Sequence, residues 1–201
     1  MKNDLMWDER LGINTEGVDY SAEDSQNYGY DPTPYAVLEE LIKLDFLNVE
    51  DVVLDYGCGC GRVGFFLESQ VGCRTIGIDH SQKLLDWAHE NLEGYGKTGN
   101  IDFVLSKAED YCPKEANRFY FFNPFSTKVF RKVLERIGES LEKNPREILI
   151  FFYYSTIEYK LYLPTEPRLE LIESVGFDAE EISSSSDGRL DVFRFNIKEL
   201  E

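Results

Sequence analysis

Three glycines in alternate positions carry the most specific chemical signal in the sequence: Gly57, Gly59 and Gly61. They follow an apolar run and precede a helical pattern. Because glycine has no Cβ atom, it allows a tight turn and a close approach to a ligand. Asp55 stands just before them, and Asp79 ends the next apolar run, where a carboxylate can grip a ribose diol. These residue types at this spacing predict a nucleotide-type cofactor site.

Two classes of cofactor fit the glycine spacing. Gly59, Gly61 and Gly64 satisfy the dinucleotide pattern G-x-G-x-x-G, whereas Gly57, Gly59 and Gly61 suit a loop that binds S-adenosylmethionine. Asp55 favours the second class, because a dinucleotide brings an anionic pyrophosphate to the helix N-terminus, while the ammonium and sulfonium groups of S-adenosylmethionine are cationic. We therefore expect S-adenosyl-L-methionine as the cofactor. An NAD(P)-dependent oxidoreductase and a non-catalytic cofactor-binding module are the alternatives.

Three segments occur in a fixed order along the chain: V-V-L-D-Y-G-C-G-C-G-R from Val52, I-G-I-D-H-S from Ile76, and F-Y-F-F-N-P-F from Phe119. With these segments, residues 31–195 resemble the class I S-adenosylmethionine-dependent methyltransferases. The resemblance implies an α/β, Rossmann-like fold: a seven-stranded, mostly parallel sheet in the order 3-2-1-4-5-7-6, with strand 7 antiparallel and helices on both faces. It also implies an enzyme that transfers a methyl group from S-adenosyl-L-methionine.

The resemblance assigns the cofactor to particular positions. It implies that Asp55 and the glycines surround the methionine part, that Asp79 holds the ribose hydroxyls, and that Ala108 and Glu109 lie beside the adenine ring. Lys107 departs from the family, because many members have an aspartate there for the adenine amino group; that contact passes to Glu109 or to the backbone. The full expected set is Asp55, Tyr56, Gly57, Cys58, Gly59, Gly61, Asp79, His80, Ala108, Glu109 and Asn123.

Asn123 and Pro124 follow the fourth predicted strand and are the expected catalytic residues. An Asn-Pro pair there resembles the motif with which amino-methylating relatives hold a planar nitrogen through acceptor oxygens. Phe125 and Ser126 stand where that motif has a second proline and an aromatic residue. The alternative is that Asn123 or Ser126 caps the helix that begins at Thr127. The substrate pocket is expected to include Tyr30, Tyr35, Phe125, Tyr153 and Tyr154.

The remaining reactive side chains receive structural interpretations. Methyl transfer needs little acid–base help, because the sulfonium is already a good leaving group and alignment supplies much of the acceleration. His80 is therefore expected to form a wall of the cofactor pocket rather than to act as a base. Cys58 and Cys60 lack the second pair of ligands that a zinc site needs, so no metal is expected.

Short runs rich in β-branched and aromatic residues predict strands over 51–56, 74–79, 101–105, 118–123 and 148–154. Apolar residues at helical spacing predict helices over 34–46, 62–70, 82–92 and 127–141, and this alternation favours a parallel sheet. A helix over 166–175 and two antiparallel strands around a Ser-Ser-Asp-Gly turn are expected to follow. Residues 1–30 are expected to form an irregular N-terminal arm or lid, and residues 31–201 a single S-adenosylmethionine-binding methyltransferase domain.

The composition of the chain limits the classes of partner and the cellular location that we expect. The 201 residues include 21 Lys and Arg against 38 Asp and Glu, which gives a formal net charge of −17 and argues against direct binding to nucleic acid. No apolar run is long enough for a membrane span, and four cysteines are too few to staple the chain, so a reducing, cytoplasmic location is expected. The expected acceptor is a nitrogen or oxygen atom of a small molecule or of a protein side chain.

Overall fold

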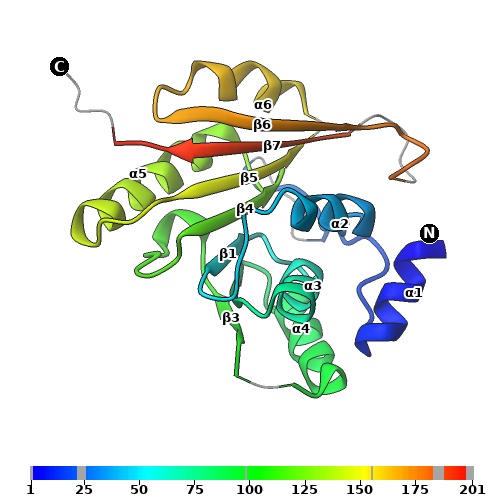
Figure 1. Cartoon of the computed structure of the whole chain (residues 1–201). Coiled ribbons are helices and arrows are strands. Elements are labelled where there is room, and N and C mark those ends of the chain that lie inside the picture. The colour runs from blue at the N-terminus through cyan, green and yellow to red at the C-terminus, as the bar shows by residue number, and fades with distance from the viewer. Residues whose placement is uncertain (1, 22–25, 98, 155, 183–187, 198–201) are drawn as a thin grey trace.

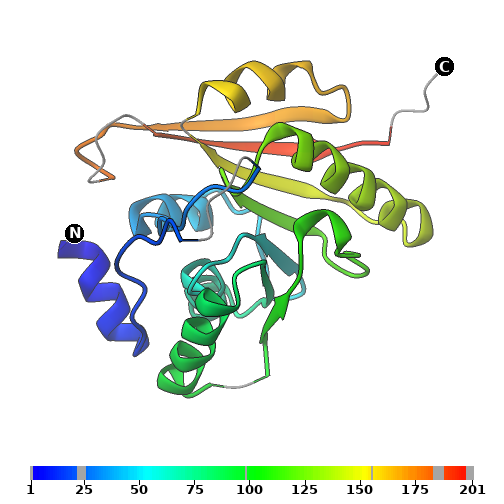
Figure 2. The same ribbon diagram turned by 180° about the vertical axis from the view of Figure 1, so that it is seen from behind.

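The computed structural model is a mixed sheet with helices on both faces (Figures 1 and 2), and it describes residues 2–21, 26–97, 99–154, 156–182 and 188–197. The strands are β1 (Val52–Tyr56), β2 (Arg74–Asp79), β3 (Ile101–Leu105), β4 (Arg118–Phe122), β5 (Leu149–Tyr154), β6 (Leu169–Phe177) and β7 (Gly188–Phe195). The α-helices are α1 (Lys2–Leu11), α2 (Tyr35–Lys43), α3 (Arg62–Val71), α4 (Gln82–Tyr95), α5 (Thr127–Lys143) and α6 (Ile157–Tyr162). Short 3₁₀ turns occupy Ala108–Asp110 and Leu163–Thr165.

The strand order is β3-β2-β1-β4-β5-β7-β6, as the family resemblance implied. β1 pairs in parallel with both β2 and β4, and β7 is antiparallel to both β5 and β6. The chain therefore leaves β1 toward one edge of the sheet and returns at β4 on the other side. A crevice forms at such a change of direction, outside the carboxyl ends of the strands.

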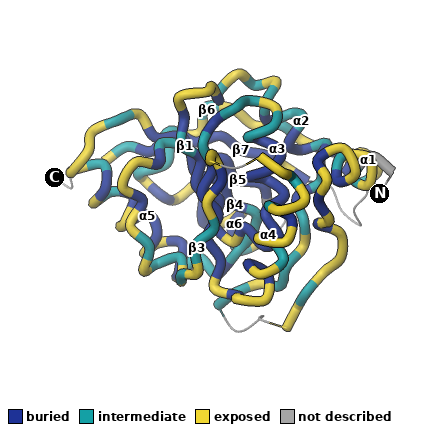
Figure 3. The backbone as a smooth tube through the Cα atoms, turned by 90° about the horizontal axis from the view of Figure 1, so that it is seen from below, coloured by how far each residue is buried: buried dark blue, intermediate teal, exposed yellow. Residues whose placement is uncertain are grey.

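Two apolar clusters lie on opposite faces of this sheet. The first packs α2 and α3 against the strands through residues such as Leu38 and Phe66, and the second packs α5 through residues such as Phe130. Along β4, Tyr120 belongs to the first cluster and Phe121 to the second, as the alternation of side chains along a strand requires. Figure 3 shows the buried positions concentrated in the strands between these layers.

Helix α1 corrects the expectation of an irregular arm for residues 2–11. Trp7 packs its ring against Tyr35 and Phe66, with ring centroids 5.8 and 5.0 Å apart, respectively. An isolated helix of ten residues is marginal in water, so these tertiary contacts hold it in place. In Figure 1, α1 lies outside α2 and α3. The rest of the N-terminal segment, up to the start of α2 at Tyr35, contains only isolated bridges, bends and turns in its described part.

The expected helix over residues 166–175 is wrong, because residues 169–175 lie in the edge strand β6 and residues 166–168 precede it. Ile172 and Val175 pack against the same apolar cluster although they are three positions apart. A register shift between Leu171 and Glu173 in the pairing with β7 breaks the alternation of the strand and produces this helix-like spacing. The antiparallel pairing of the last two strands is confirmed, whereas most of the Ser-Ser-Asp-Gly turn lies outside the described residues.

Candidate active site

A pocket opens at the carboxyl ends of β1, β2 and β4. Three parts of the chain line it: the glycine-rich loop after β1, the ends of β2, β3 and β4 with the residues that follow them, and the N-terminal segment. The lining from the sheet edge includes Asp55, Gly57, Cys58, Ile78, Asp79, His80, Ser106, Ala108, Phe122, Pro124 and Phe125.

The backbone of the glycine-rich loop adopts a conformation that side chains disfavour. Gly57 and Gly59 have φ angles of 79° and 53°, in the left-handed region. A Cβ atom on Gly57 would lie 2.7 Å from Pro124, and one on Gly59 would lie 2.3 Å from the ring of Tyr30. The backbone N–H of Gly57 also donates to the carbonyl of Ile78 over 2.8 Å. The loop therefore lies against the end of β2, and its positions 57 and 59 have room only for glycine.

Two carboxyl groups face this loop, and only that of Asp79 forms hydrogen bonds with described residues. Asp79 Oδ2 accepts from the N–H of Gly59 at 3.0 Å, and its Oδ1 accepts from the N–H of Ser81 at 2.8 Å. Asp55 is only 4% exposed, and among the described residues its side chain forms no hydrogen bond or ion pair. Burial, and then the nearby charge of Asp79, raises the pKa of Asp55 to about 8. The pocket thus contains a buried carboxyl group without a partner, a position suited to a cationic ligand.

The N-terminal segment crosses the pocket. Asp19 and Tyr30 exchange backbone hydrogen bonds of 3.1 and 2.7 Å, and Tyr28 donates its N–H to the carbonyl of Pro124 at 3.2 Å. Ser126 in turn donates to the carbonyl of Gln26 at 2.7 Å. Because Tyr30 lies over Gly59, this segment covers both the glycine-rich loop and the residues after β4.

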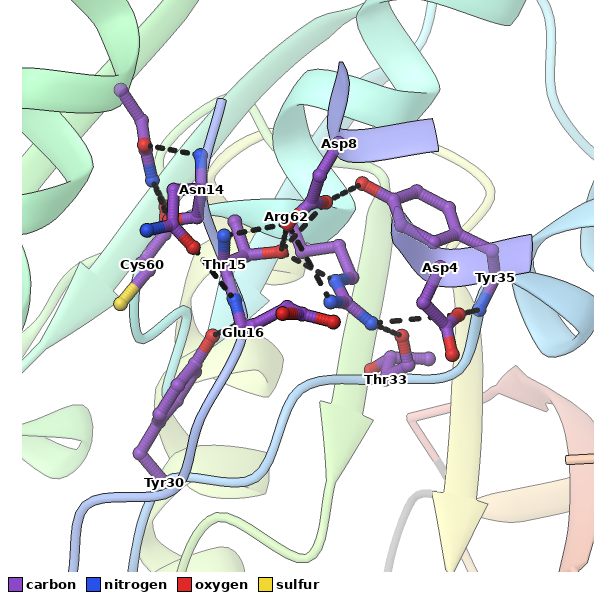
Figure 4. A network of polar contacts seen from close by, with 11 residues as sticks. Asp4, Asp8, Asn14, Thr15, Glu16, Tyr30, Thr33, Tyr35, Cys60 and Arg62 are labelled. Atoms are coloured by element: carbon purple, nitrogen blue, oxygen red, sulfur yellow. Dashed lines mark hydrogen bonds and ion pairs between the residues drawn. The ribbon is translucent and has the colours of Figure 1, made fainter. Parts of the chain in front are cut away.

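Arg62 anchors the N-terminal segment to the helix that follows the glycine-rich loop (Figure 4). Its Nε donates to Thr15 Oγ1 at 2.6 Å, and its NH1 group donates to the carbonyl of Thr33 at 3.0 Å. Asp8 lies 3.8 Å from the guanidinium and accepts hydrogen bonds from Thr15 and from the Tyr35 hydroxyl. Arg62 is 4% exposed, so this is a buried network in which each charge has a partner.

The structure brings many of the predicted site residues together. The pocket lining contains Tyr30, Asp55, Gly57, Cys58, Asp79, His80, Ala108, Pro124 and Phe125. Gly59 lies beneath Tyr30, and Gly61 immediately precedes α3. His80 Nδ1 lies 3.6 Å from Asp79 Oδ1 and forms part of the wall.

Other predicted residues lie elsewhere. Tyr56 points to the opposite face of the sheet from Asp55 and stacks on Phe121 at 5.0 Å, as strand alternation dictates. Tyr35 is fully buried, with its hydroxyl bonded to Asp8. Glu109 faces α5, where Lys132 Nζ lies 3.6 Å away. These three side chains are absent from the described pocket lining.

The residues near the ends of β4 and β5 have separate positions. Asn123 has a φ of 38°, and Thr156 Oγ1 lies 3.5 Å from its side-chain oxygen; Asn123 is not part of the described pocket lining, whereas Pro124 is. Tyr153 lines a second cavity that adjoins the first. The side chain of Tyr154 lies outside the described part of the chain.

Sequence reasoning missed three charged residues of the site. Asp19 and Asp31 line the pocket from the N-terminal segment, and Arg62 joins that segment to α3. Arg62 directly follows the last glycine of the loop. A positive charge at the start of a helix calls for acidic or carbonyl partners, and this was the signal that could have found it. Asp19 and Asp31 give no such signal, because acidic residues are scattered throughout the first part of the chain.

Comparison with known proteins shows similarity to methyltransferases. Residues 53–144 match the family described as a methyltransferase domain. A probable cobalt-precorrin-6B C(15)-methyltransferase (decarboxylating) from Methanococcus vannielii is 26% identical over 166 residues, which are 80% of this chain and 83% of that protein. A histone-lysine N-methyltransferase, H3 lysine-79 specific, from Dictyostelium discoideum is 43% identical over 61 residues, 30% of this chain but only 3% of that protein.

The fold has solved counterparts. The RNA methyltransferase from Salinibacter ruber in complex with S-adenosyl-L-homocysteine superimposes with a TM-score of 0.60 at 17% identity, over 85% of this chain and 97% of that one. At this identity the likeness concerns the fold. Together with the match of residues 53–144 to a methyltransferase domain and the strand order, it gives the chain the fold of the class I S-adenosylmethionine-dependent methyltransferases. The family uses the cofactor predicted from the acidic glycine-rich loop, and the oxidoreductase alternative receives no support.

Proposed function

We propose that the protein transfers a methyl group from S-adenosyl-L-methionine to a nitrogen or oxygen atom of a small molecule or of a protein side chain. The observation that carries this proposal is the pocket-facing carboxyl group of Asp55, which is buried and without a hydrogen-bond or ion-pair partner among the described residues. A buried carboxylate is stabilised by a nearby cation, and the cofactor brings two cationic groups. A dinucleotide would instead bring anionic phosphates to this carboxylate.

The residues of the pocket fit this cofactor. In the proposed assignment, Asp55 holds the ammonium group, Asp79 accepts from the ribose hydroxyls, and Ala108 lies against the adenine ring. The outward orientation of Glu109 leaves the adenine amino group to backbone carbonyls. When bound, the cofactor supplies an activated methyl group, and the protein supplies alignment. We retain Asn123 and Pro124 as the residues that border the transfer site, because Pro124 contributes to the lining.

Charge and the relatives support the proposed acceptor class. The net charge of −17 disfavours a nucleic-acid phosphate backbone. The similar Dictyostelium protein is named for action on a histone lysine, which is a protein amine. The four cysteines are free thiols, which agrees with a cytoplasmic location. In the described part of the chain, no helix is long and apolar enough to cross a membrane.

We also assign the function of a cover to residues 26–30. Tyr30 lies over Gly59, and the backbone of Tyr28 is bonded to Pro124, so this segment shields the pocket from solvent. Exclusion of water from the site strengthens every charge interaction inside it. Residues 26–30 are thus part of the proposed binding site rather than of a separate extension of the domain.

Calorimetric titration with S-adenosylmethionine, S-adenosylhomocysteine and NADH tests the cofactor assignment. Wild-type protein should bind the first two and not NADH. Asp55→Asn and Asp79→Asn should each weaken binding about 30-fold, because a hydrogen bond to a charged group contributes about 1.5–3 kcal/mol. Asp86→Asn, an exposed carboxylate on α4 outside the pocket lining, is the matched control and should bind as the wild type does. Binding of NADH alone would overturn the proposal.

A further inference from the structure

A second cavity adjoins the cofactor pocket. The two cavities share Asp31, Pro32, Arg62 and Phe122 in their linings. The second one extends away from the shared residues between the N-terminal segment and the end of β5, with Asp4, Glu16 and Tyr153 in its walls. The two cavities are therefore neighbours, with Asp31 and Phe122 at their common boundary.

The opposite approach to the cofactor pocket is covered. Residues after β4 pair with the N-terminal segment through an antiparallel bridge between Asn27 and Phe125 and through the bonds of Gln26 and Tyr28 described above. Glu158 on α6 accepts from the hydroxyl of Tyr28 at 3.0 Å and holds this cover from the other side. The second cavity is thus the better candidate for the acceptor.

The charge of this cavity is acidic. Arg62 is the one basic residue among its described lining residues, and its charge is already offset by Asp4 at 3.7 Å and Asp8 at 3.8 Å. The carboxylates of Glu16 and Asp31 are exposed, and neither forms a hydrogen bond or ion pair with another described residue. Two carboxylates without direct partners therefore face the cavity.

An aromatic wall lies beside these carboxylates. Phe122 and Tyr153, paired across β4 and β5, have ring centroids 4.7 Å apart, and Tyr153 packs edge-on against Phe177 at 6.3 Å. Tyr153 is only 5% exposed, so packing fixes its ring. Carboxylates beside aromatic side chains suit an organic cation, because both the charge and the ring faces attract it. The same surroundings repel a carboxylate or phosphate.

We propose that the second cavity binds the methyl acceptor, that the acceptor is an amine protonated in solution, and that Asp31 holds this amine where the two cavities meet. The proposal rests on the proposed function and narrows it from nitrogen or oxygen to an amine nitrogen. Asp31 is the carboxylate common to both cavities, so it alone among Asp4, Glu16 and Asp31 touches the path between acceptor and cofactor.

The proposed transfer balances in protons and electrons. The ammonium group of the acceptor gives one proton to the Asp31 carboxylate, which passes it to solvent, and the freed lone pair forms the nitrogen–carbon bond. The electron pair of the broken sulfur–carbon bond stays on sulfur, so the products are a methylated ammonium, S-adenosylhomocysteine and one proton. Neighbouring protein atoms that displace water raise the pKa of Asp31, while the charge of Arg62 lowers it.

Binding to the S-adenosylhomocysteine complex of the full chain tests the inference without turnover. The probes are hexylamine and 2-phenylethylamine, each paired with its neutral counterpart, hexanol and 2-phenylethanol. At least one amine should bind about tenfold or more tightly than its alcohol, a difference of about 1.4 kcal/mol. Asp31→Asn should reduce that preference to about twofold or less, whereas Asp86→Asn should keep it. Methyl transfer from labelled S-adenosylmethionine should follow the same order.

The outcomes separate the two proposals. If the wild type binds no S-adenosylhomocysteine, the proposed function fails. If it binds S-adenosylhomocysteine but both alcohols bind as well as the amines, or Asp31→Asn keeps the preference, the amine inference is overturned and the cofactor assignment stands. Because Asp31 is an exposed residue, Asp31→Asn is expected to fold, and an unchanged melting temperature checks this.

Discussion

The two halves of the site are built in different ways. The cofactor half comes from β1, the glycine-rich loop and β2, which are close in sequence and packed in the interior of the sheet. The acceptor half is assembled from the N-terminal segment and the ends of β4 and β5, which are far apart in sequence. Local sequence motifs therefore identify the cofactor half. The acceptor half cannot be recognised in this way, because it forms only where segments that are distant in sequence come into contact.

Arg62 joins the two halves, so its removal should have the largest effect. It is the first residue of α3, directly after the glycine-rich loop, and it donates hydrogen bonds to Thr15 and to the carbonyl of Thr33 in the N-terminal segment. Arg62→Ala leaves the buried carboxylate of Asp8 without its cation and should lower the free energy of unfolding by about 3–5 kcal/mol. Chemical denaturation measures this loss.

The matched control for that change is Arg136→Ala. Arg136 is an exposed arginine on α5 that pairs with Glu139, and its removal should alter the free energy of unfolding by less than about 1 kcal/mol. Limited proteolysis should also cut residues 1–30 faster in Arg62→Ala than in the control. Equal stability of the two variants would mean that the halves do not depend on this network.

A substitution inside the cofactor half should weaken cofactor binding strongly, with less effect on folding. Gly59→Ala places a Cβ atom in the left-handed region, 2.3 Å from the ring of Tyr30. The affinity for S-adenosylmethionine should fall about 100-fold, through strain and displacement of Tyr30. Gly99→Ala is the control, because Gly99 has a φ of 121° with nothing within 4 Å of its added Cβ. If the double variant Gly59→Ala, Tyr30→Ala recovers part of the affinity, the loss is due to the clash with the ring of Tyr30.

The buried carboxyl of Asp55 predicts a pH dependence confined to the cofactor half. Its pKa of about 8 means that it carries a proton at pH 6, whereas a bound cation favours its charged form. Affinity for S-adenosylmethionine should rise about tenfold per pH unit from about pH 6 to about pH 8 and then level off. Titrations in buffers of different ionisation enthalpy should detect release of a proton, and Asp55→Asn should show neither effect.

The ionisation of Asp55 should also make the stability of the cofactor-free protein fall with rising pH, whereas the cofactor affinity rises. The folded-state pKa of Asp55 lies above its ordinary value of 3.8, so the folded protein holds this proton more tightly than the unfolded chain. Its contribution to stability is complete below about pH 4 and is lost as the pH rises through about 8. The cofactor-free wild type should therefore lose thermal stability over this range more steeply than Asp55→Asn does. Parallel curves for the two proteins would contradict the assignment.

The smallest expected effect belongs to the edge of the cover. Tyr28→Phe removes an exposed hydrogen bond to Glu158, for which about 0.5–1.5 kcal/mol is typical. The dissociation rate of S-adenosylmethionine should rise about twofold to tenfold, which stopped-flow fluorescence can follow. Tyr20→Phe, at a tyrosine that is 60% exposed and outside both cavity linings, should leave the rate unchanged. A similar rise in both variants would argue against a cover held by Tyr28.

Sequence patterns predicted the elements that have local signals. The loop from Asp55 to Gly61 is strand, turn and helix start in one continuous segment, and its glycines have the positive φ angles that explain their presence. The predicted helix over 82–92 is confirmed as α4, which Ser81 caps by accepting from the N–H of Leu84. The five parallel strands follow the same logic, because continuous apolar runs between two helical layers are easily recognised.

The predictions that the structure contradicts failed for two kinds of physical reason. A bulge in β6 gave Ile172 and Val175 a helical spacing, so the local period misled. Helix α1 is held by Trp7 and Asp8 through contacts with residues far along the chain, which no local pattern encodes. The acceptor half shares the second cause: Asp31 matters because it lies beside Arg62 and Tyr153, and its own neighbours in sequence do not reveal this.

The position of β7 between β5 and β6 has a consequence for synthesis on the ribosome. β6 is made before β7 and has no partner in the sheet until β7 inserts beside it. The second cavity, which takes Tyr153 from β5 and Ile182 from the connection between β6 and β7, is therefore completed late. The nascent chain can form the β1–β2 part of the cofactor pocket while its outer strands remain unpaired, an interval in which an exposed strand edge favours aggregation.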